Sequence, residues 1–309
     1  MSGLGQTSGE PVPFRPGPGR GGRGPVGVCG AYVTNTTVNI LLTNDDSHIS
    51  PLLALVIEAL RGRGTLTIVV PKHEQSWRGK SMTRFENLHL EELTIAGEPA
   101  FTVDGTPADC VNLALHHIVS SRPDVVVSGI NAGLNTGAGF ILASGTIGAC
   151  LEANIAGIPG IALSQGFDSA TMNQYAAEYA LPVATIARLR AQALPLLTGL
   201  FDRFAASAEL RTRPITWNVN FPFEADPAAR LMPARVGRTT YGSIFARTEI
   251  HFEHRLREVH VDPAPDTDAG VLRSGHASVT PLDIFSFGQL ESSAHRDLVP
   301  LLAAEGGTP

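Results

Sequence analysis

The stretch VNILLTNDD, at residues 38–46, decides the fold prediction for this chain. Its first part, from Val38 to Leu42, is an apolar run of the kind that forms a strand buried on both faces of a sheet. The polar residues that follow leave this strand at its carboxyl end. We therefore expect a buried strand that delivers two adjacent carboxylates, Asp45 and Asp46, to one edge of a sheet.

A helix should follow this strand, because Pro51 suits a first helical turn and Ser50 is a plausible N-cap. The same alternation of strand and helix continues along the chain. It predicts strands at 66–70, 101–103, 125–128, 160–164 and 215–220, helices at 107–119, 145–156 and within 171–204, and a Gly/Asn-rich loop at 129–144. Such alternation implies an α/β fold with a doubly wound, mainly parallel, Rossmann-like sheet.

The two ends of the chain differ in composition from its middle. Residues 1–35 are rich in glycine and proline and are expected to form a disordered extension. Residues 36–285 are expected to form one domain. Alternation of apolar and polar residues at 250–261 predicts hairpins there, so a projecting arm is expected at about 225–265. Residues 286–309 are interpreted as a C-terminal tail.

Composition excludes several classes of protein. The formal net charge of −6 over 309 residues argues against a stable nucleic-acid partner, because such proteins usually present a basic face. The three cysteines are widely scattered and have no metal-ligand spacing, which fits a reduced, cytoplasmic setting. No apolar run is long enough to span a membrane, and none resembles a signal peptide.

Three predicted strand ends carry polar candidates for a functional site. In an open α/β sheet, ligands bind beyond the carboxyl ends of the strands. Asp45 and Asp46 would repel each other there, and a divalent cation such as Mg²⁺, Mn²⁺ or Ca²⁺ would relieve that repulsion. Ser76 and Asn131 add oxygen donors after two other strands. The alternative is an ordinary turn capped by Asp45, with Asp46 facing solvent.

The segment around Asn131 also has the composition of a phosphate site. Gly133 and the glycines after it would let backbone amides turn inward, and Ser144, Gly145 and Thr146 open a helix whose N-terminus attracts anions. Ordinary turn chemistry and an N-cap would explain the same residues. Neither GxGxxG after the first strand nor a GxxxxGK[ST] loop is present, which disfavours dinucleotide-dependent and P-loop enzymes.

Six motifs, in order along the chain, are similar to those of the SurE phosphatase family. They are ILLTNDD at 40–46, GTPADCV at 105–111, VSGINAG at 127–133, SGT at 144–146, NVNFP at 218–222 and SVTPL at 278–282. The resemblance covers roughly residues 38–285.

The resemblance implies a 5'- and possibly 3'-nucleotidase that acts on nucleoside monophosphates with one divalent cation per subunit. According to this resemblance, the metal ligands are Asp45, Asp46, Ser76 and Asn131. The two aspartates would also be the catalytic residues, and Asn44 joins the candidate phosphate-binding residues named above. It further implies a homodimer or homotetramer with exchanged C-terminal segments.

Two residues depart from the family pattern. Ser47 and Trp77 stand where the family usually has glycine, after the paired aspartates and after the loop serine. A residue with a β-carbon tolerates positive φ poorly, so these loops would bend differently. Trp77 would either cover the pocket or stack on a nucleobase. The departures also keep open a second hypothesis, a nucleotide-binding sensor that has lost catalysis.

Overall fold

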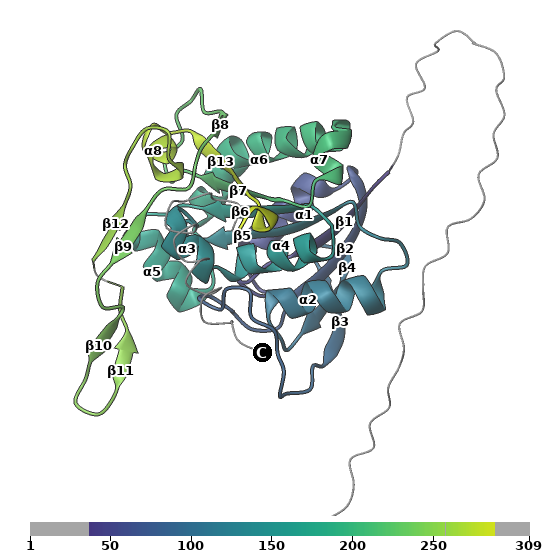
Figure 1. Cartoon of the computed structure of the whole chain (residues 1–309), viewed down its shortest axis with the longest axis horizontal. Helices are drawn as coiled ribbons and strands as arrows, with labels where there is room; N and C mark the ends of the chain where they lie inside the picture. Colours follow the sequence, from purple (N-terminus) through teal and green to yellow (C-terminus); the bar gives the residue numbers. More distant parts are fainter. Residues whose placement is uncertain (1–36, 257, 288–309) are drawn as a thin grey trace, which may run out of the picture. The chain divides into compact units, whose positions relative to one another are not determined.

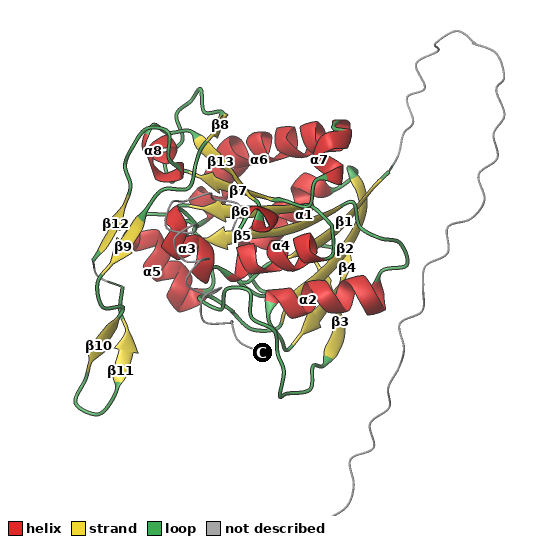
Figure 2. Ribbon diagram, in the orientation of Figure 1, coloured by secondary structure: helices red, strands yellow, loops and turns green. Residues whose placement is uncertain are grey.

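The structure is a computed structural model, and it describes residues 37–256 and 258–287 (Figures 1 and 2). The predicted extension at 1–35 and nearly all of the predicted tail at 286–309 lie outside these residues. The described chain confirms the α/β prediction, because Figure 2 shows helices on both sides of a central sheet.

The central sheet has nine strands in the order β3-β4-β2-β1-β5-β6-β7-β13-β8. Their bounds are β1 Val38–Thr43, β2 Gly64–Pro71, β3 Leu90–Ile95, β4 Glu98–Val103, β5 Val125–Ala132, β6 Gly160–Gln165, β7 Thr216–Phe221, β8 Leu231–Pro233 and β13 Ala277–Leu282. All neighbouring pairs are parallel except β3 with β4 and β7 with β13. The sheet is therefore mainly parallel, as the alternation predicted.

The helices divide between the two faces of this sheet. Their bounds are α1 Pro51–Leu60, α2 Pro107–Leu113, α3 Gly137–Ala143, α4 Gly145–Ile155, α5 Ser169–Glu178, α6 Val183–Ala206, α7 Ala208–Thr212 and α8 Asp268–Arg273, with a π-helical turn η1 at Ala114–Ile118 and a 3₁₀ turn η2 at Ile284–Ser286. Ile40 and Leu42 of β1 pack in one core with α1 and α6, whereas Leu41 packs in another with α2 and α4. This alternation explains why Ile40, Leu41 and Leu42 are all apolar.

The order in which successive strands are placed in the sheet reverses at β1. The strands β2 and β4 lie on one side of β1, and β5, β6 and β7 lie on the other. The point between β1 and β5 is therefore a topological switch point, where α/β proteins bind ligands. The loop after β1 carries Asp45 and Asp46, and the end of β5 carries Asn131, so the fold brings these residues to one place.

The predicted loop at 129–144 is partly wrong. The strand β5 continues to Ala132, and Gly137–Ala143 forms the helix α3. Glycines lower helix propensity, but neighbouring segments accept the first amides of this helix. The Gly137 amide donates to the Asp268 carboxylate at 2.7 Å, and the Ala138 amide donates to the Gly237 carbonyl at 3.0 Å. Tertiary contacts thus stabilise a helix that local composition disfavours.

The predicted arm is confirmed in part. β9 (Thr239–Tyr241) pairs with β12 (Val259–Val261), and β10 (Phe245–Arg247) pairs with β11 (Phe252–His254), both antiparallel. Residues 239–256 and 258–261, which we call the arm, project away from the sheet (Figure 1). The predicted range of 225–265 was too wide, because β8 is a strand of the central sheet.

Across residues 37–256 and 258–287, no single helix is both long enough and apolar enough to cross a membrane. Only α3 and α4 taken together reach that length and composition, and a bend of 71° separates them.

The α6 face of the sheet offers a test of the core. Leu197 of α6 is fully buried in the core with α1, whereas Leu142 of α3 is largely exposed. We expect Leu197→Ala to lower the free energy of unfolding by about 2–5 kcal/mol, because it leaves a cavity. Leu142→Ala is the matched control and should change it by less than about 0.5 kcal/mol. Urea denaturation measures both, and equal effects would contradict the packing of α6.

Candidate metal and phosphate site

Asp45 is fixed by the first turn of helix α4. Its Oδ1 accepts the Thr146 hydroxyl at 2.7 Å, and its Oδ2 accepts the Thr146 amide at 3.1 Å. Gly145 permits this approach, because a β-carbon there would lie 3.0 Å from both the Asp45 β-carbon and the Gln75 carbonyl oxygen. Asp45 is thus clamped in one orientation at the end of β1.

Asp46 is held by two segments far away in the sequence. Its Oδ2 accepts the Ala132 amide at 2.8 Å, which ties the loop after β1 to the end of β5. The Tyr175 hydroxyl of α5 lies near enough to Asp46 to oppose the rise in the pKa of that carboxyl, and it lies 3.0 Å from the Ser50 hydroxyl. Tyr175 was missed in the sequence, since no local motif shows that α5 reaches the end of β1.

The two carboxylates carry an uncompensated negative charge. Each is only 3% exposed. Burial raises the pKa of Asp45 to about 6, and burial followed by the charge of Asp45 raises the pKa of Asp46 well above its usual range. Among the described residues, no lysine, arginine or histidine forms an ion pair with either carboxylate. The site therefore favours a cation strongly.

The loop that carries Ser76 is fastened on both sides. The Gln75 amide donates to the Asp45 carbonyl at 2.8 Å, and the Gly79 amide donates to the Ala143 carbonyl at 2.9 Å. Further along, Thr83 donates to the Asp109 carboxylate through its amide and its hydroxyl. The long polar connection after β2 is thus an ordered segment that holds Ser76 beside Asp45.

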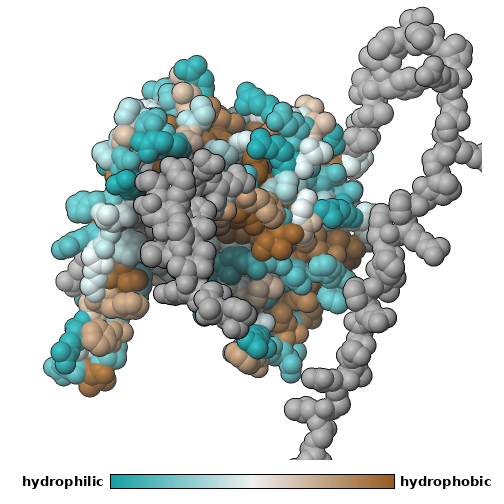
Figure 3. All heavy atoms as spheres, viewed as in Figure 1, coloured by the Kyte–Doolittle hydropathy of each residue, from teal (hydrophilic) through white to brown (hydrophobic). Residues whose placement is uncertain are grey.

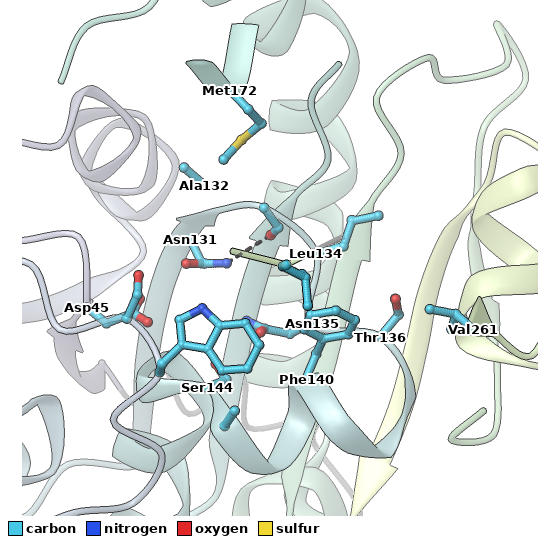
Figure 4. Close-up of a pocket in the computed structure, with 15 residues that line it drawn as sticks. Asp45, Asn131, Ala132, Leu134, Asn135, Thr136, Phe140, Ser144, Met172 and Val261 are labelled. Atoms are coloured by element: carbon cyan, nitrogen blue, oxygen red, sulfur yellow. Dashed lines mark hydrogen bonds between the residues drawn. The ribbon is translucent and has the colours of Figure 1, made fainter. Parts of the chain in front are cut away.

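Asn131 presents its side-chain oxygen to the same place. Its Nδ2 donates to the Gly133 carbonyl at 2.9 Å, so its Oδ1 is directed the other way. Figure 4 shows this oxygen on the side that faces Asp45. The register of β5 against β6 shifts between Ser128 and Asn131, which marks the irregularity that lets the strand end present this side chain.

A buried asparagine cluster supports the loop after β5. The Asn135 amide donates to Asn220 Oδ1 at 2.8 Å, and the Asn135 Nδ2 donates to the Ser164 hydroxyl at 2.9 Å. The Nδ2 of Asn218 and that of Asn220 donate to the Asn135 carbonyl at 2.9 Å and 3.2 Å. The motif at 218–222 therefore acts by fixing this loop.

These elements surround a pocket of about 430 Å³ (Figure 4). It is lined by Asp45, Ser76, Trp77, Asn131, Ala132, Gly133, Leu134, Asn135, Thr136, Phe140, Ala143, Ser144, Met172, Leu256 and Val261. Three of the four predicted metal ligands thus line one pocket. Asp46 is not among the lining residues, but it accepts a hydrogen bond from the amide of Ala132, which is.

The structure changes the predicted phosphate contacts. Asn44 is fully buried away from the pocket, and its Nδ2 donates to the Ser47 carbonyl at 2.8 Å, so it shapes the turn. Both donors of Thr146 are engaged by Asp45, and Gly145 serves close packing. The Gly133 amide donates to the Gln165 carbonyl at 2.8 Å. Asn44, Thr146 and Gly133 therefore have these donors engaged within the protein, and Gly145 allows the close approach of Asp45.

Ser144 remains as a candidate phosphate contact. It lines the pocket, and its hydroxyl oxygen accepts the Ile147 amide at 3.2 Å as the N-cap of α4. The hydroxyl proton is then available for a ligand in the pocket.

Ser47 and Trp77 keep the backbone conformation that glycine would adopt. Their φ angles are 70° and 62°, in the left-handed region. Both residues therefore lie in the backbone region that favours glycine. A residue with a β-carbon in this region costs roughly 1–2 kcal/mol, so the rest of the structure must hold both loops in place.

The donor set fits a hard divalent cation. Within the described residues there is no group of three or more His, Cys, Asp or Glu side chains placed to hold a metal ion. The two carboxylates would therefore need Ser76 and Asn131 to complete an all-oxygen set. Such a set, with room left in the pocket, suits Mg²⁺ or Mn²⁺ rather than a zinc site.

A doubly wound α/β sheet with an acidic, oxygen-rich pocket at its switch point defines a class of proteins that bind small ligands beyond the carboxyl ends of their strands. Within that class the chain belongs to the SurE family. The family model described as "Survival protein SurE" matches residues 40–243.

Known relatives agree with this assignment. The chain is 35% identical to the 5'-nucleotidase SurE of Methanocella arvoryzae, over 74% of this chain and 91% of that protein. It is 35% identical to the 5'-nucleotidase SurE of Geotalea daltonii, over 80% of this chain and 93% of that protein. The crystal structure of the SurE protein from Aquifex aeolicus superposes with a TM-score of 0.63 at 25% identity, covering 84% of this chain and 99% of that one.

The buried charge predicts an unusual response to mutation. The pKa of Asp45 is about 6 in the fold against an ordinary 3.8. The ionised form of Asp45 therefore destabilises the metal-free fold, and this cost grows as the pH rises from 3.8 and is complete above about 6. We expect Asp45→Asn to raise the free energy of unfolding at pH 8 with a chelator present, by on the order of 2 kcal/mol. Urea denaturation measures the change.

The matched control for this prediction is Asp202→Asn. Asp202 is an exposed carboxylate paired with Arg63 at 3.0 Å, so its loss should change stability by less than about 1 kcal/mol. A destabilised Asp45→Asn protein would contradict the uncompensated charge.

Proposed function

We propose that this chain is a divalent-metal-dependent phosphomonoesterase that hydrolyses nucleoside 5'-monophosphates, and possibly 3'-monophosphates, to nucleoside and phosphate. As a member of the SurE family, whose relatives carry the name 5'-nucleotidase, it is a nucleotidase. The observation that carries the proposed metal dependence is the pair of buried carboxylates, Asp45 and Asp46, without a cationic partner among the described residues.

The proposed ligands for one cation per subunit are Asp45, Asp46, Ser76 and Asn131. The first two supply charge, and the others supply neutral oxygens from neighbouring strand ends. When bound, the cation would supply the positive charge that draws a phosphate group to this acidic edge and stabilises it during transfer.

The protein's own groups would carry the remaining steps. Thr146 holds Asp45, while Ala132 and Tyr175 hold Asp46, so either carboxylate is oriented to accept a proton from the attacking water. The Ser144 hydroxyl and the Asn131 side chain line the pocket and would bind phosphate oxygens. The surrounding apolar walls would limit access of bulk water.

The alternative hypothesis, a sensor without catalysis, rested on Ser47 and Trp77. Both residues adopt the left-handed backbone that glycine adopts readily, so the turns beside the proposed ligands Asp46 and Ser76 form in this chain without glycine. This supports turnover over binding alone.

Release of inorganic phosphate tests the proposal. We expect the wild-type chain to hydrolyse AMP in the presence of Mn²⁺ or Mg²⁺ and to stop when a chelator is added. Asp45→Asn should abolish the release, whereas Asp202→Asn should retain it. Undiminished hydrolysis by Asp45→Asn would exclude the assigned site, and tight AMP binding without release would favour the sensor.

Thr146 offers a finer test of how Asp45 is held. Thr146→Val removes the hydroxyl that donates to Asp45 at 2.7 Å while preserving shape. Loss of such a supporting contact typically costs about 10- to 100-fold in metal affinity or activity. We expect this loss in calorimetric Mn²⁺ titrations, with recovery in Thr146→Ser. Unchanged affinity would contradict the positioning role.

We propose also that the chain forms a homodimer or homotetramer through the arm, with exchange of C-terminal segments. The hairpin β10–β11 exposes Phe245, Ile250 and Phe252. Figure 3 shows apolar and polar residues side by side at this hairpin. Contiguous exposed apolar side chains on a projecting hairpin favour contact with another protein surface.

Light scattering tests the proposed assembly. The double variant Phe245→Ser, Phe252→Ser should shift the wild-type oligomer toward monomer, because it removes apolar area from the contact. Phe85→Ser is the control, since Phe85 is even more exposed than Phe245 and Phe252 but lies outside the arm. A monomeric wild-type chain would contradict the proposal.

We propose, finally, that the chain acts in the cytoplasm on small molecules and has no stable nucleic-acid partner. The formal net charge of −6 supports this, and so do Cys110 and Cys150, which are buried free thiols.

A further inference from the structure

We propose that Trp77 is the nucleobase-stacking residue of this pocket and determines its preference for nucleotides over simple sugar phosphates. The inference rests on the proposed function and specifies its substrate: a phosphate ester whose leaving group carries an aromatic ring. Trp77 stands where the family pattern has glycine, so this would be a property of the present chain.

The pocket has two chemically different ends. Asp45, Ser76, Asn131 and Ser144 give one end its carboxylate, hydroxyl and amide groups, whereas the rest of the wall is mainly apolar. The apolar wall consists of Trp77, Leu134, Phe140, Met172, Leu256 and Val261. Figure 4 shows Asp45 and Val261 at opposite sides of the pocket. A ligand with one anionic end and one flat apolar end matches this division.

Trp77 joins the two ends because it directly follows Ser76. The loop is held by the Gln75 and Gly79 amides, so the position of the indole is set by the same bonds that set the Ser76 hydroxyl. A phosphate bound near Ser76 would therefore place the rest of its ester beside Trp77.

The indole is fixed before any ligand arrives. Its ring centroid lies 5.9 Å from that of Phe140 in α3, at an interplanar angle of 63°, and 4.9 Å from that of His254 in the arm, at 61°. Phe245 supports His254 in turn, with ring centroids 6.1 Å apart. Edge-to-face contacts of this kind are favourable and hold the ring still. A rigid platform loses little entropy on binding.

Trp77 also keeps an accessible surface toward the pocket. It is 38% exposed, and neither of its two ring contacts is a parallel stack. Parallel stacking on the indole is therefore still available to a ligand. Had Trp77 served only as a cover, its apolar surface would gain most from full burial against the protein.

The chemistry of the wall predicts how selective the subsite is. Among the described residues that line the pocket, Asp45 is the only one with a charged side chain, and Thr136 is a polar group near Val261 at the other side. Stacking on an aromatic ring is tolerant of base identity, because every base has a π-face. The subsite would therefore distinguish aromatic from non-aromatic leaving groups more strongly than one base from another.

The experiment compares AMP with ribose 5-phosphate, which lacks the base, and uses the phosphonate analogue of each, in which a methylene group replaces the ester oxygen, so that Mn²⁺ causes no hydrolysis during the measurement. Calorimetry with Mn²⁺ present measures the dissociation constants of both ligands for wild type, Trp77→Gly, Trp77→Phe and the control Phe85→Gly. Trp77→Gly should fold, because glycine readily adopts the φ of 62° found there. Phe85 is a largely exposed aromatic residue outside the pocket.

Trp77→Gly should weaken AMP binding by about 5- to 150-fold and leave ribose 5-phosphate binding unchanged. Trp77→Phe should retain most of the AMP affinity, and Phe85→Gly all of it. Equal weakening of both ligands, or no weakening of either, would overturn the stacking role. Because binding is measured without turnover, a chain that releases no phosphate would overturn the proposed hydrolysis and leave this comparison decisive for Trp77.

Discussion

The hydrogen bonds between Asp45 and Thr146 are the interaction on which the site depends. They join the end of the first strand to the start of helix α4, and Gly145 leaves the space for that contact. A carboxylate at a helix N-terminus is favourable, because unpaired amides and the helix dipole attract negative charge. This stabilisation offsets part of the cost of burying Asp45 beside Asp46. The remaining negative charge is what a cation would neutralise.

Strain and charge are concentrated in the same small region. Ser47 and Trp77 adopt left-handed backbone conformations directly beside the proposed ligands Asp46 and Ser76. Local conformational preference alone would not maintain these turns. They persist because surrounding hydrogen bonds, such as Asn44 to the Ser47 carbonyl, determine the course of the chain. A site that is unfavourable on its own is thus stabilised by the fold around it.

The arm contributes to the site as well as to the surface. Leu256 and Val261 line the pocket, and His254 packs against Trp77. A segment that projects from the sheet therefore helps to form the apolar half of the pocket. Contacts made by the arm with a second subunit would act on the position of His254, and so on the wall beside the proposed metal.

The sequence by itself determined the elements whose pattern is local. The apolar run at 38–42 specified a doubly buried strand, and its end placed Asp45 and Asp46 at the edge of the sheet, because burial on two faces requires continuous apolar residues. Only the tertiary structure decided the partners of the polar groups. The amides near Gly133 and Thr146 were expected to bind phosphate, yet they bind Gln165 and Asp45, and Tyr175 reaches Asp46 from α5. Hydrogen-bond partners depend on which distant segments pack together, and no local pattern of residues contains that information.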